Sequence, residues 1–366
     1  MEDHVLVEVA ESISFIERCM VAIGTNPSHA TLLAELLVTA DRRGHYSHGI
    51  NRIDVYLGNV ERGVTAKDGK PVIIKEMAGT AWVDGKNLLG PIVGQFCVDL
   101  AIEKAKQAGI GWVVAKGSNH YGIAGWYSMR IKDAGMIGLS FTNTSPCTFP
   151  TRSRQIITGS NPLACSAPAE NGDSFDLDMA TTTVAYGKAE ICHLKGQSLP
   201  KGWGCDSGGK ETSDPSEVLN GGGLQPLGGE EITGGYKGTG LALMVEVLTG
   251  ILGGAHFGSN IRKWHGGDRE ADLGQCFVAI NSDAFAPGFS ERMTSLMASC
   301  RNSEPADGET EVLVAGDPER VHMEKVRQEG GITYHKNLIT KLNGISTRLK
   351  VDPIVVKNHD AEKVVD

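Results

Sequence analysis

Several short motifs that would define a common protein class are missing from this 366-residue chain. None of its four G-x-G triplets has a glycine three positions further on, so the Rossmann fingerprint G-x-G-x-x-G is absent. The phosphate-binding pattern G-x-x-x-x-G-K-[ST] and the serine-hydrolase pattern G-x-S-x-G are absent as well. If this protein binds a nucleotide, it therefore does so with a different set of residues from these motifs.

Close cysteine pairs and long apolar runs are also missing. The eight cysteines form no C-x-x-C pair, which excludes a zinc ribbon and a dense disulfide scaffold, so we expect no metal site and mostly buried, reduced thiols. The longest apolar run, residues 241–252, contains Glu246 and is too short to cross a bilayer. The acidic start Met-Glu-Asp-His lacks the pattern of a signal peptide. These observations predict a cytoplasmic protein without membrane contact.

Positive charge is in deficit, and glycine is in excess. The chain has 35 Lys plus Arg against 44 Asp plus Glu, a net charge of −9 that disfavours a nucleic-acid partner. Its 47 glycines exceed the usual share of about 7% and follow no three-residue period. They therefore indicate many tight turns in a globular α/β protein.

The apolar spacing predicts helices first and alternating strands and helices later. Helical faces run over residues 7–20 and 32–40, and a third helix is expected from about residue 47 to 62. Asn26 followed by Pro27 is typical of a helix start. The glycine-rich residues 197–233 are expected to form a long surface excursion.

The first candidate site is the segment Gly44-His45-Tyr46-Ser47-His48-Gly49 with Arg52 and Tyr56 after it. In a helix that begins here, His48, Arg52 and Tyr56 lie at i, i+4 and i+8 on one face. An arginine can bind a carboxylate by two hydrogen bonds while a histidine exchanges a proton. The alternative is a solvated helix start with ordinary histidines.

Three further segments combine small and polar residues. His120 lies in a polar loop directly after an apolar strand, where α/β sheets place ligands, although it could equally be an ordinary loop histidine. The small residues 158–162 would let backbone amides approach a phosphate or ribose; Asp178 nearby could equally be a helix N-cap. Lys237 lies in a glycine-rich turn before an apolar helix, which suits an anion or a flexible surface turn.

Five segments occur in a fixed order: DRRGHYSHG at 41–49, SNHYG at 118–122, GSNP at 159–162, DMAT at 178–181 and YKGTGL at 236–241. Together they resemble the malate/L-lactate dehydrogenase family, a group of NAD(P)-dependent oxidoreductases that lack a Rossmann fold. The resemblance runs from about residue 5 to about residue 345. That family also contains sulfolactate, ureidoglycolate and diketogulonate oxidoreductases and a cyclic-imine reductase.

The resemblance implies an α/β fold like that of L-sulfolactate dehydrogenase. A mixed or mostly antiparallel sheet would form a non-Rossmann cofactor domain over residues 76–300. Residues 1–75 would form the N-terminal helical part of a substrate and dimer domain, and the helices of residues 301–350 would return to it. Residues 351–366 would be a loose tail, and the protein would be a homodimer.

The resemblance also implies roles for individual residues. His120 matches a proton acceptor, and His48 with Ser47 matches a second catalytic group; both histidines are kept because family members differ in which one is credited. Arg52 matches the position that binds the substrate carboxylate, with Tyr56 beside it as a substrate contact. The positions that match cofactor contacts are Thr144, Asn161, Asp178, Met179, Ala180, Thr181, Tyr236 and Lys237.

The implied activity is the interconversion of a small 2-hydroxy acid and its 2-oxo acid, above all malate and oxaloacetate. NAD is the expected cofactor, with NADP as the alternative. Other substrates are L-lactate, sulfolactate, ureidoglycolate, a sugar acid or a cyclic imine, although Lys188 stands where the imine reductase has an aspartate. A non-catalytic, dimeric nucleotide-binding protein is the remaining alternative.

Overall fold

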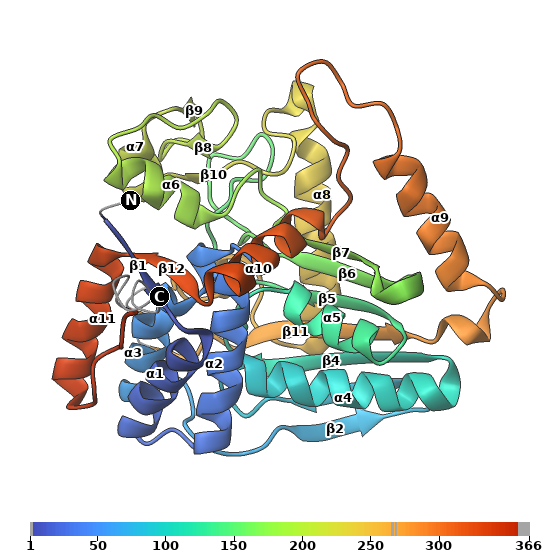
Figure 1. Cartoon of the computed structure of the whole chain (residues 1–366), viewed down its shortest axis with the longest axis horizontal. Coiled ribbons are helices and arrows are strands. Elements are labelled where there is room, and N and C mark those ends of the chain that lie inside the picture. Colours follow the sequence, from blue (N-terminus) through green and yellow to red (C-terminus); the bar gives the residue numbers. More distant parts are fainter. Residues whose placement is uncertain (1–2, 265–266, 268, 358–366) are drawn as a thin grey trace, which may run out of the picture. The chain divides into compact units, whose positions relative to one another are not determined.

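The computed structural model describes residues 3–264, 267 and 269–357. Contacts within the chain divide it into two compact units. The first unit contains the chain up to Asp68 and again from Asp317 onward, and the second contains Gly69–Gly316. Blue and red ribbons in Figure 1 therefore mark the first unit, which both ends of the sequence build.

The first unit is mainly helical and carries one short two-stranded sheet. Strand β1 pairs antiparallel with β12, with Val7 opposite Ile332, and this ladder joins the two ends of the sequence. The elements of this unit are β1 (His4–Val7), α1 (Val9–Ala22), α2 (Pro27–Arg42), the 3-10 turns Tyr46–His48 and Ile50–Arg52, α3 (Ile53–Glu61), α10 (Asp317–Glu329), β12 (Ile332–His335) and α11 (Lys336–Leu349).

The predicted start of the second helix is confirmed. The Asn26 side chain accepts a hydrogen bond from the Ser28 N–H at 3.0 Å, and Pro27 occupies the first turn. Ile16 and Leu33, from the two predicted apolar faces, are fully buried. The spacing of apolar residues therefore identified the faces that pack in the core.

The second unit is built on a mixed sheet of seven strands in the order β2-β3-β4-β11-β5-β6-β7. In this sheet β3 and β4 pair in parallel and the other neighbours pair antiparallel. The strands are β2 (Val72–Glu76), β3 (Thr80–Asp84), β4 (Ile110–Ser118), β5 (Ile137–Thr142), β6 (Leu163–Pro168), β7 (Ser174–Met179) and β11 (Leu273–Ile280).

Helices cover both faces of this sheet (Figure 1). On one face, Val114 and Cys276 pack against Val245 of α8. On the other face, Gly111 approaches α4 so closely that a Cβ would lie 1.9 Å from the Ala101 carbonyl oxygen. The helices of this unit are α4 (Gly90–Ala108), α5 (Gly125–Asp133), α6 (Tyr186–Leu194), α7 (Pro215–Leu219), α8 (Gly235–Glu246), which continues into a π-helical turn (Val247–Ile251), and α9 (Phe289–Arg301).

The expectation of a long surface excursion over residues 197–233 is wrong. Three two-residue strands, β8 (Gly204–Cys205), β9 (Glu211–Thr212) and β10 (Gly223–Leu224), form a small sheet in the order β10-β8-β9. Leu199, Val218 and Leu224 are buried in its own apolar core. Few apolar residues suffice here because glycine lets the short strands pack closely, so the segment did not look like a folded region.

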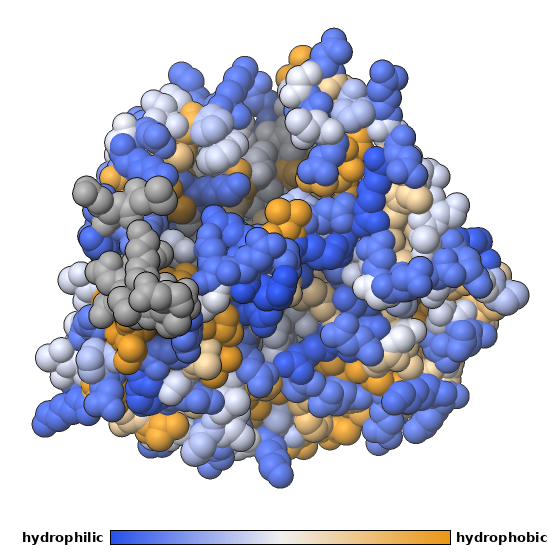
Figure 2. All heavy atoms as spheres, viewed as in Figure 1, coloured by the Kyte–Doolittle hydropathy of each residue, from blue (hydrophilic) through white to orange (hydrophobic). Residues whose placement is uncertain are grey.

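Hydrophilic side chains predominate on the face drawn in Figure 2, and hydrophobic ones lie there in small groups. Within the described part of the chain, no helix has the length and apolar character needed to cross a membrane. The same residues contain no group of three or more histidine, cysteine, aspartate or glutamate side chains that could hold a metal ion. Residues 351–357 form no helix, but Lys357 donates its N–H to Leu6 at 2.8 Å; the rest of the predicted tail lies outside the described residues.

Candidate active site

The segment that carries His48 and Arg52 is not one continuous helix. Gly49 separates the two 3-10 turns with an extended ψ of −149°, and α3 begins only after the second turn. The prediction that His48, Arg52 and Tyr56 lie on one face of a single helix is therefore wrong for His48. Arg52 and Tyr56 do lie one helical turn apart at the start of α3.

A buried carboxylate holds this segment in place. Asp41, near the end of α2, is 1% exposed and accepts two hydrogen bonds at Oδ2, from the Ile50 N–H at 2.9 Å and from the Tyr334 hydroxyl at 2.8 Å. A Cβ at Gly49 would lie 1.7 Å from Asp41 Oδ1, so this close approach requires glycine. Burial raises the pKa of the Asp41 carboxyl to about 7.

Side chains from the C-terminal part of the chain support the same segment. The Tyr46 hydroxyl lies 3.3 Å from His322 Nε2, and His322 Nδ1 lies 2.8 Å from the Arg42 carbonyl oxygen. The Tyr46 ring also packs edge-on against Tyr334, with 6.2 Å between the ring centroids. Helix α10 and strand β12 therefore help to fix the conformation around Ser47 and His48.

Ser47 contacts both His48 and Arg52. Ser47 Oγ lies 2.9 Å from His48 Nδ1, and Arg52 Nε donates to the Ser47 carbonyl oxygen at 2.7 Å. Burial, and secondly the charge of Arg52, lower the pKa of His48 to about 4, so its ring is neutral at pH 7. Tyr56 is 3% exposed, and burial raises the pKa of its hydroxyl, which stays protonated.

His120 lies in the loop after β4 in the second unit, as predicted. Next to it, Asn119 is 4% exposed and donates through Nδ2 to the Leu88 carbonyl oxygen at 2.9 Å. The Gly122 N–H donates to His120 Nδ1 at 3.3 Å, in a turn where Gly122 has a φ of +75°. Both the backbone before His120 and one nitrogen of its ring are therefore held.

Asp178 does not cap a helix that follows it, because it belongs to strand β7. Its Oδ2 instead accepts a hydrogen bond at 2.8 Å from the N–H of Gly125, at the start of α5. This contact satisfies one of the unpaired amides of that helix and places the end of β7 near the chain that follows His120. Met179 ends β7 and Ala180 follows it, both half-buried.

Hydrogen bonds bring together the segments predicted to bind a cofactor. The Thr144 N–H donates to Asn161 Oδ1 at 3.0 Å, and the Thr181 N–H donates to the Ser160 carbonyl oxygen at 2.9 Å. The Leu227 N–H in turn donates to the Thr181 carbonyl oxygen at 2.9 Å. Segments that are far apart in the sequence therefore meet in one cluster, which we call the cofactor cluster.

The first turn of α8 joins the cofactor cluster through close backbone packing. A Cβ at Gly238 would lie 2.3 Å from the Leu227 nitrogen, and a Cβ at Gly235 would lie 1.9 Å from the Gly229 carbonyl oxygen. Tyr236 is 56% exposed, and Lys237 is exposed beside it. The glycines of this turn thus serve packing, and the two side chains between them face outward.

Sequence reasoning missed a buried glutamate in the cofactor cluster. Glu246 is 4% exposed and accepts hydrogen bonds from Asn161 Nδ2 and Asn143 Nδ2, each at 3.0 Å. Asn161 Nδ2 also donates to the Ala242 carbonyl oxygen at 3.1 Å. The side chain of Asn161 therefore links Thr144 to helix α8. A charged residue inside an apolar helix was the signal that could have identified Glu246.

Asp41 and Trp264 were also missed. Asp41 stands at the start of the quoted segment DRRGHYSHG, but no spacing rule links it to Tyr334 almost three hundred residues later. Trp264 packs against His120 with 3.7 Å between the ring centroids, although the two residues lie far apart in the sequence. Both contacts depend on the tertiary fold.

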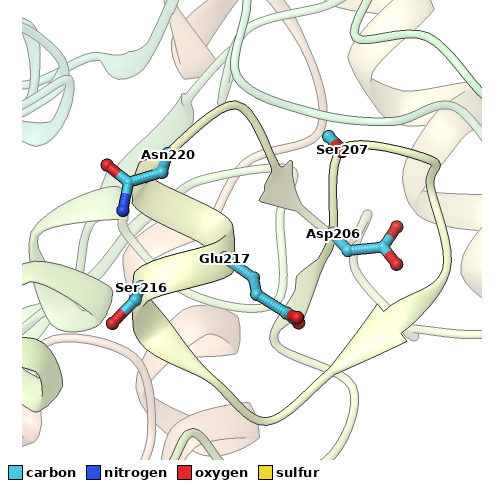
Figure 3. Close-up of a pocket in the computed structure, with 5 residues that line it drawn as sticks. All are labelled: Asp206, Ser207, Ser216, Glu217 and Asn220. Atoms are coloured by element: carbon cyan, nitrogen blue, oxygen red, sulfur yellow. The ribbon is translucent and has the colours of Figure 1, made fainter.

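A depression of about 310 Å³ in the small sheet is lined by Asp206, Ser207, Ser216, Glu217 and Asn220 (Figure 3). None of the predicted site residues lines it. Its two carboxylates disfavour an anionic substrate or a pyrophosphate by like-charge repulsion. This depression is therefore not a candidate for the active site.

A larger depression of about 880 Å³ adjoins the cofactor cluster. Gln225, Pro226 and Gly229 line it together with Phe149 and Arg152, among others. Pro226 forms a bridge with Thr182, next to the clustered Thr181. The volume is within the range of sites that bind a nucleotide or another small molecule.

The mixed sheet and the hydrogen-bonded segments beside it are the features to compare with known proteins. The family model for malate/L-lactate dehydrogenase matches residues 7–343. The chain belongs to the malate/L-lactate dehydrogenase family. The predicted family, fold class and enzymatic nature are thereby confirmed.

Individual relatives cover nearly the whole chain. A malate dehydrogenase from Pyrococcus abyssi is 37% identical over 358 residues, which are 97% of this chain and 98% of the relative. An L-sulfolactate dehydrogenase from Methanocaldococcus jannaschii is 36% identical over 328 residues, 89% of this chain and 92% of the relative. The crystal structure of malate dehydrogenase from Entamoeba histolytica has a TM-score of 0.90 and 30% identity, and the match covers 95% of this chain and 99% of that one.

Proposed function

We propose that this enzyme interconverts malate and oxaloacetate with NAD as its cofactor. The observation that carries the proposal is the cofactor cluster, in which hydrogen bonds gather the predicted segments near the His120 loop. The malate dehydrogenase from Pyrococcus abyssi supports malate as the substrate. Sulfolactate is the second candidate, because the relative from Methanocaldococcus jannaschii is almost equally similar.

We expect the nicotinamide dinucleotide to bind at the cofactor cluster. The ammonium of Lys237, in the first turn of α8, favours a phosphate, and Tyr236 offers an exposed ring beside it. Thr144 and Ala180 are small enough to let the backbone approach a ligand. A bound nicotinamide nucleotide supplies or accepts the hydride, while the protein orients the substrate and moves the proton.

We assign the substrate carboxylate to Arg52. Its Nε–H bond to the Ser47 carbonyl oxygen fixes the plane of the guanidinium, and a fixed plane suits two parallel hydrogen bonds to a carboxylate. Tyr56 lies one turn further along α3 and stays protonated, so its hydroxyl is able to donate a hydrogen bond. These two residues would bind substrate, and neither would exchange a proton.

We assign proton exchange to His120. A proton carrier works best when its pKa lies near the operating pH, and the pKa of His48, at about 4, lies well below it. Neutral His48, held by Ser47, would serve as a hydrogen-bonding group. At His120 the Gly122 N–H donates to Nδ1 at 3.3 Å; proton exchange with the substrate oxygen would use Nε2, and this long contact at Nδ1 would open when Nδ1 carries a proton.

Steady-state kinetics tests the proposed function. Purified protein is offered a panel of 2-oxo acids with NADH or NADPH, and turnover is followed by the absorbance of the reduced nicotinamide. We expect the highest kcat/KM with oxaloacetate and NADH. His120→Ala should lower kcat by about 10²–10⁴-fold and leave NADH binding intact, whereas His48→Ala should retain more activity. A higher kcat/KM with another 2-oxo acid would contradict malate as the substrate. An unchanged kcat in His120→Ala would show that His120 does not exchange the proton.

We also propose that the enzyme is a homodimer. Leu243, Val247 and Ile251 follow one another at helical spacing along α8 and its π-helical turn and are 47%, 51% and 54% exposed. Such an apolar helix face is typical of a subunit interface. Leu243→Arg should yield monomers in analytical ultracentrifugation, while Leu296→Arg, at a comparably exposed leucine of α9, should not. A wild-type monomer contradicts this part of the proposal.

A further inference from the structure

The ring of Trp264 packs against the ring of His120. The ring centroids are 3.7 Å apart and the ring planes are inclined by 62°. At this inclination the edge of one ring lies against the face of the other. The position of the His120 imidazole therefore depends on the indole beside it.

The sheet explains why two residues so far apart in sequence meet. Strands β4 and β11 are antiparallel neighbours, with Ser118 at the end of β4 opposite Leu273 at the start of β11. The segment that follows β4 and the segment that precedes β11 are therefore at the same end of these two strands. His120 lies on the first of these segments and Trp264 on the second.

Two hydrogen bonds also tie the two segments together, in addition to the ring contact. Asp272 Oδ1 accepts from the Gly117 N–H at 2.7 Å, and Gln275 Nε2 donates to the Asn119 carbonyl oxygen at 3.2 Å. Asp272 is held in the left-handed region, with a φ of +46°, where few side chains are favourable. The backbone that leads into His120 is therefore fixed independently of Trp264.

The backbone of Trp264 has its own support. Arg262 is 7% exposed, and its Nη1 donates to the carbonyl oxygens of Lys263 and Trp264, each at 3.3 Å. These bonds join neighbouring residues, so they stabilise the local backbone conformation in which the indole faces His120.

We propose that Trp264 is a positioning residue for His120, which keeps the imidazole in the orientation needed for proton exchange. This inference rests on the proposed role of His120 in the dehydrogenase reaction. Loss of the indole removes one of the contacts that orient the imidazole, while the hydrogen bonds of Asn119 and Asp272 keep the preceding backbone in place. The effect therefore falls on the rate of proton exchange and leaves cofactor binding unchanged.

NMR spectroscopy of protein labelled with [¹³C]histidine tests the contact directly. The chain has 11 histidines, and the signal missing from His120→Gln assigns His120. Because the ring current of an indole shifts a proton in contact with it, Trp264→Ala should move the His120 ring signals toward the shifts of exposed histidines. Trp264→Phe, which keeps a smaller aromatic ring, should give an intermediate shift.

Kinetics on the same variants tests the consequence. We expect kcat to fall roughly 10-fold or more in Trp264→Ala, since small misplacements of a reacting group are costly, and to recover largely in Trp264→Phe. The affinity for NADH should stay at the wild-type value in both. Thermal melting of each variant checks that the fold is retained.

The outcomes separate this inference from the proposed function. An unchanged His120 signal in Trp264→Ala overturns the contact, and a moved signal with wild-type kcat overturns the positioning role. In both cases turnover by the wild type leaves the proposed function standing. A wild-type protein that turns over no 2-oxo acid overturns the proposed function, whatever the NMR signals show about Trp264.

Discussion

Replacing Asp41 by asparagine tests how a buried carboxylate supports the segment of His48 and Arg52. Asp41→Asn keeps the size of the side chain and one acceptor oxygen for the Ile50 N–H and the Tyr334 hydroxyl. The substitution removes the group that titrates. We therefore expect the variant to gain stability relative to the wild type as the pH rises.

The magnitude follows from the pKa of Asp41, which burial raises from 3.8 to about 7. Below pH 4 the carboxyl is protonated in both the folded and the unfolded chain, so it contributes no pH dependence. As the pH rises the unfolded chain ionises first, and the free energy of unfolding decreases until the folded chain has ionised near pH 7. The total decrease is roughly 4 kcal/mol, an upper value because it assumes an unperturbed unfolded state.

Thermal unfolding of both proteins between about pH 4.5 and 8 measures this effect. Each kcal/mol corresponds to roughly 2–4 °C in a domain of 150–250 residues, so the melting temperature of Asp41→Asn should rise by several degrees relative to the wild type across this range. A companion variant, Tyr334→Phe, removes one donor to the carboxylate. It should raise the pKa of Asp41 further and move the loss of stability to higher pH.

A constant difference in melting temperature at every pH would refute the reasoning. That result would mean that Asp41 has the same charge in the folded and unfolded chains throughout the range. Enzyme assays at a fixed pH add a second check, because Gly49 and Ile50 depend on this carboxylate. We expect a modest change in kcat for Asp41→Asn and a larger loss for Gly49→Ala, whose new Cβ has no room.

Three further substitutions test the remaining assignments. Arg52→Lys should raise KM for oxaloacetate with a smaller fall in kcat, because lysine lacks the planar two-pronged contact; an unchanged KM in steady-state kinetics places the carboxylate elsewhere. Lys237→Ala should weaken NADH binding in a fluorescence titration more than it weakens oxaloacetate binding, and equal losses contradict the assignment. Gly238→Ala should lower the melting temperature, whereas Gly240→Ala, whose Cβ meets no atom within 4 Å, should not.

Local features of the fold could be predicted because local spacing determines them. The apolar faces of the first helices and the Asn26 cap depend on residues within one or two turns of each other. The five ordered motifs likewise indicated which segments matter, and Thr144, Asn161 and Thr181 do lie in one hydrogen-bonded cluster.

Features that depend on distant residues could not be predicted. Strand β11 lies between β4 and β5, although about 130 residues separate it from β5. The spacing of apolar residues in the sequence does not indicate such an insertion. The break at Gly49 arises because Asp41 fills the space beside it. The packing of Trp264 on His120 follows from that same insertion of β11.

The ladder between β1 and β12 has a consequence for how the chain folds as it is made. His4 pairs with His335, so the first strand to leave the ribosome has its partner near the other end of the chain. At about 5–20 residues per second, tens of seconds separate the two. The second unit is one continuous stretch, Gly69–Gly316, and is able to form its sheet during that interval.

During this interval helices α1 and α2 have been synthesised, but the C-terminal part of their unit has not. Asp41 then lacks the hydroxyl of Tyr334, and Tyr46 lacks its contact with His322. The segment of His48 and Arg52 therefore acquires its final support only when synthesis is almost complete. A ribosome that stalls before Asp317 would release a chain whose second unit is complete but whose His48 segment lacks this support.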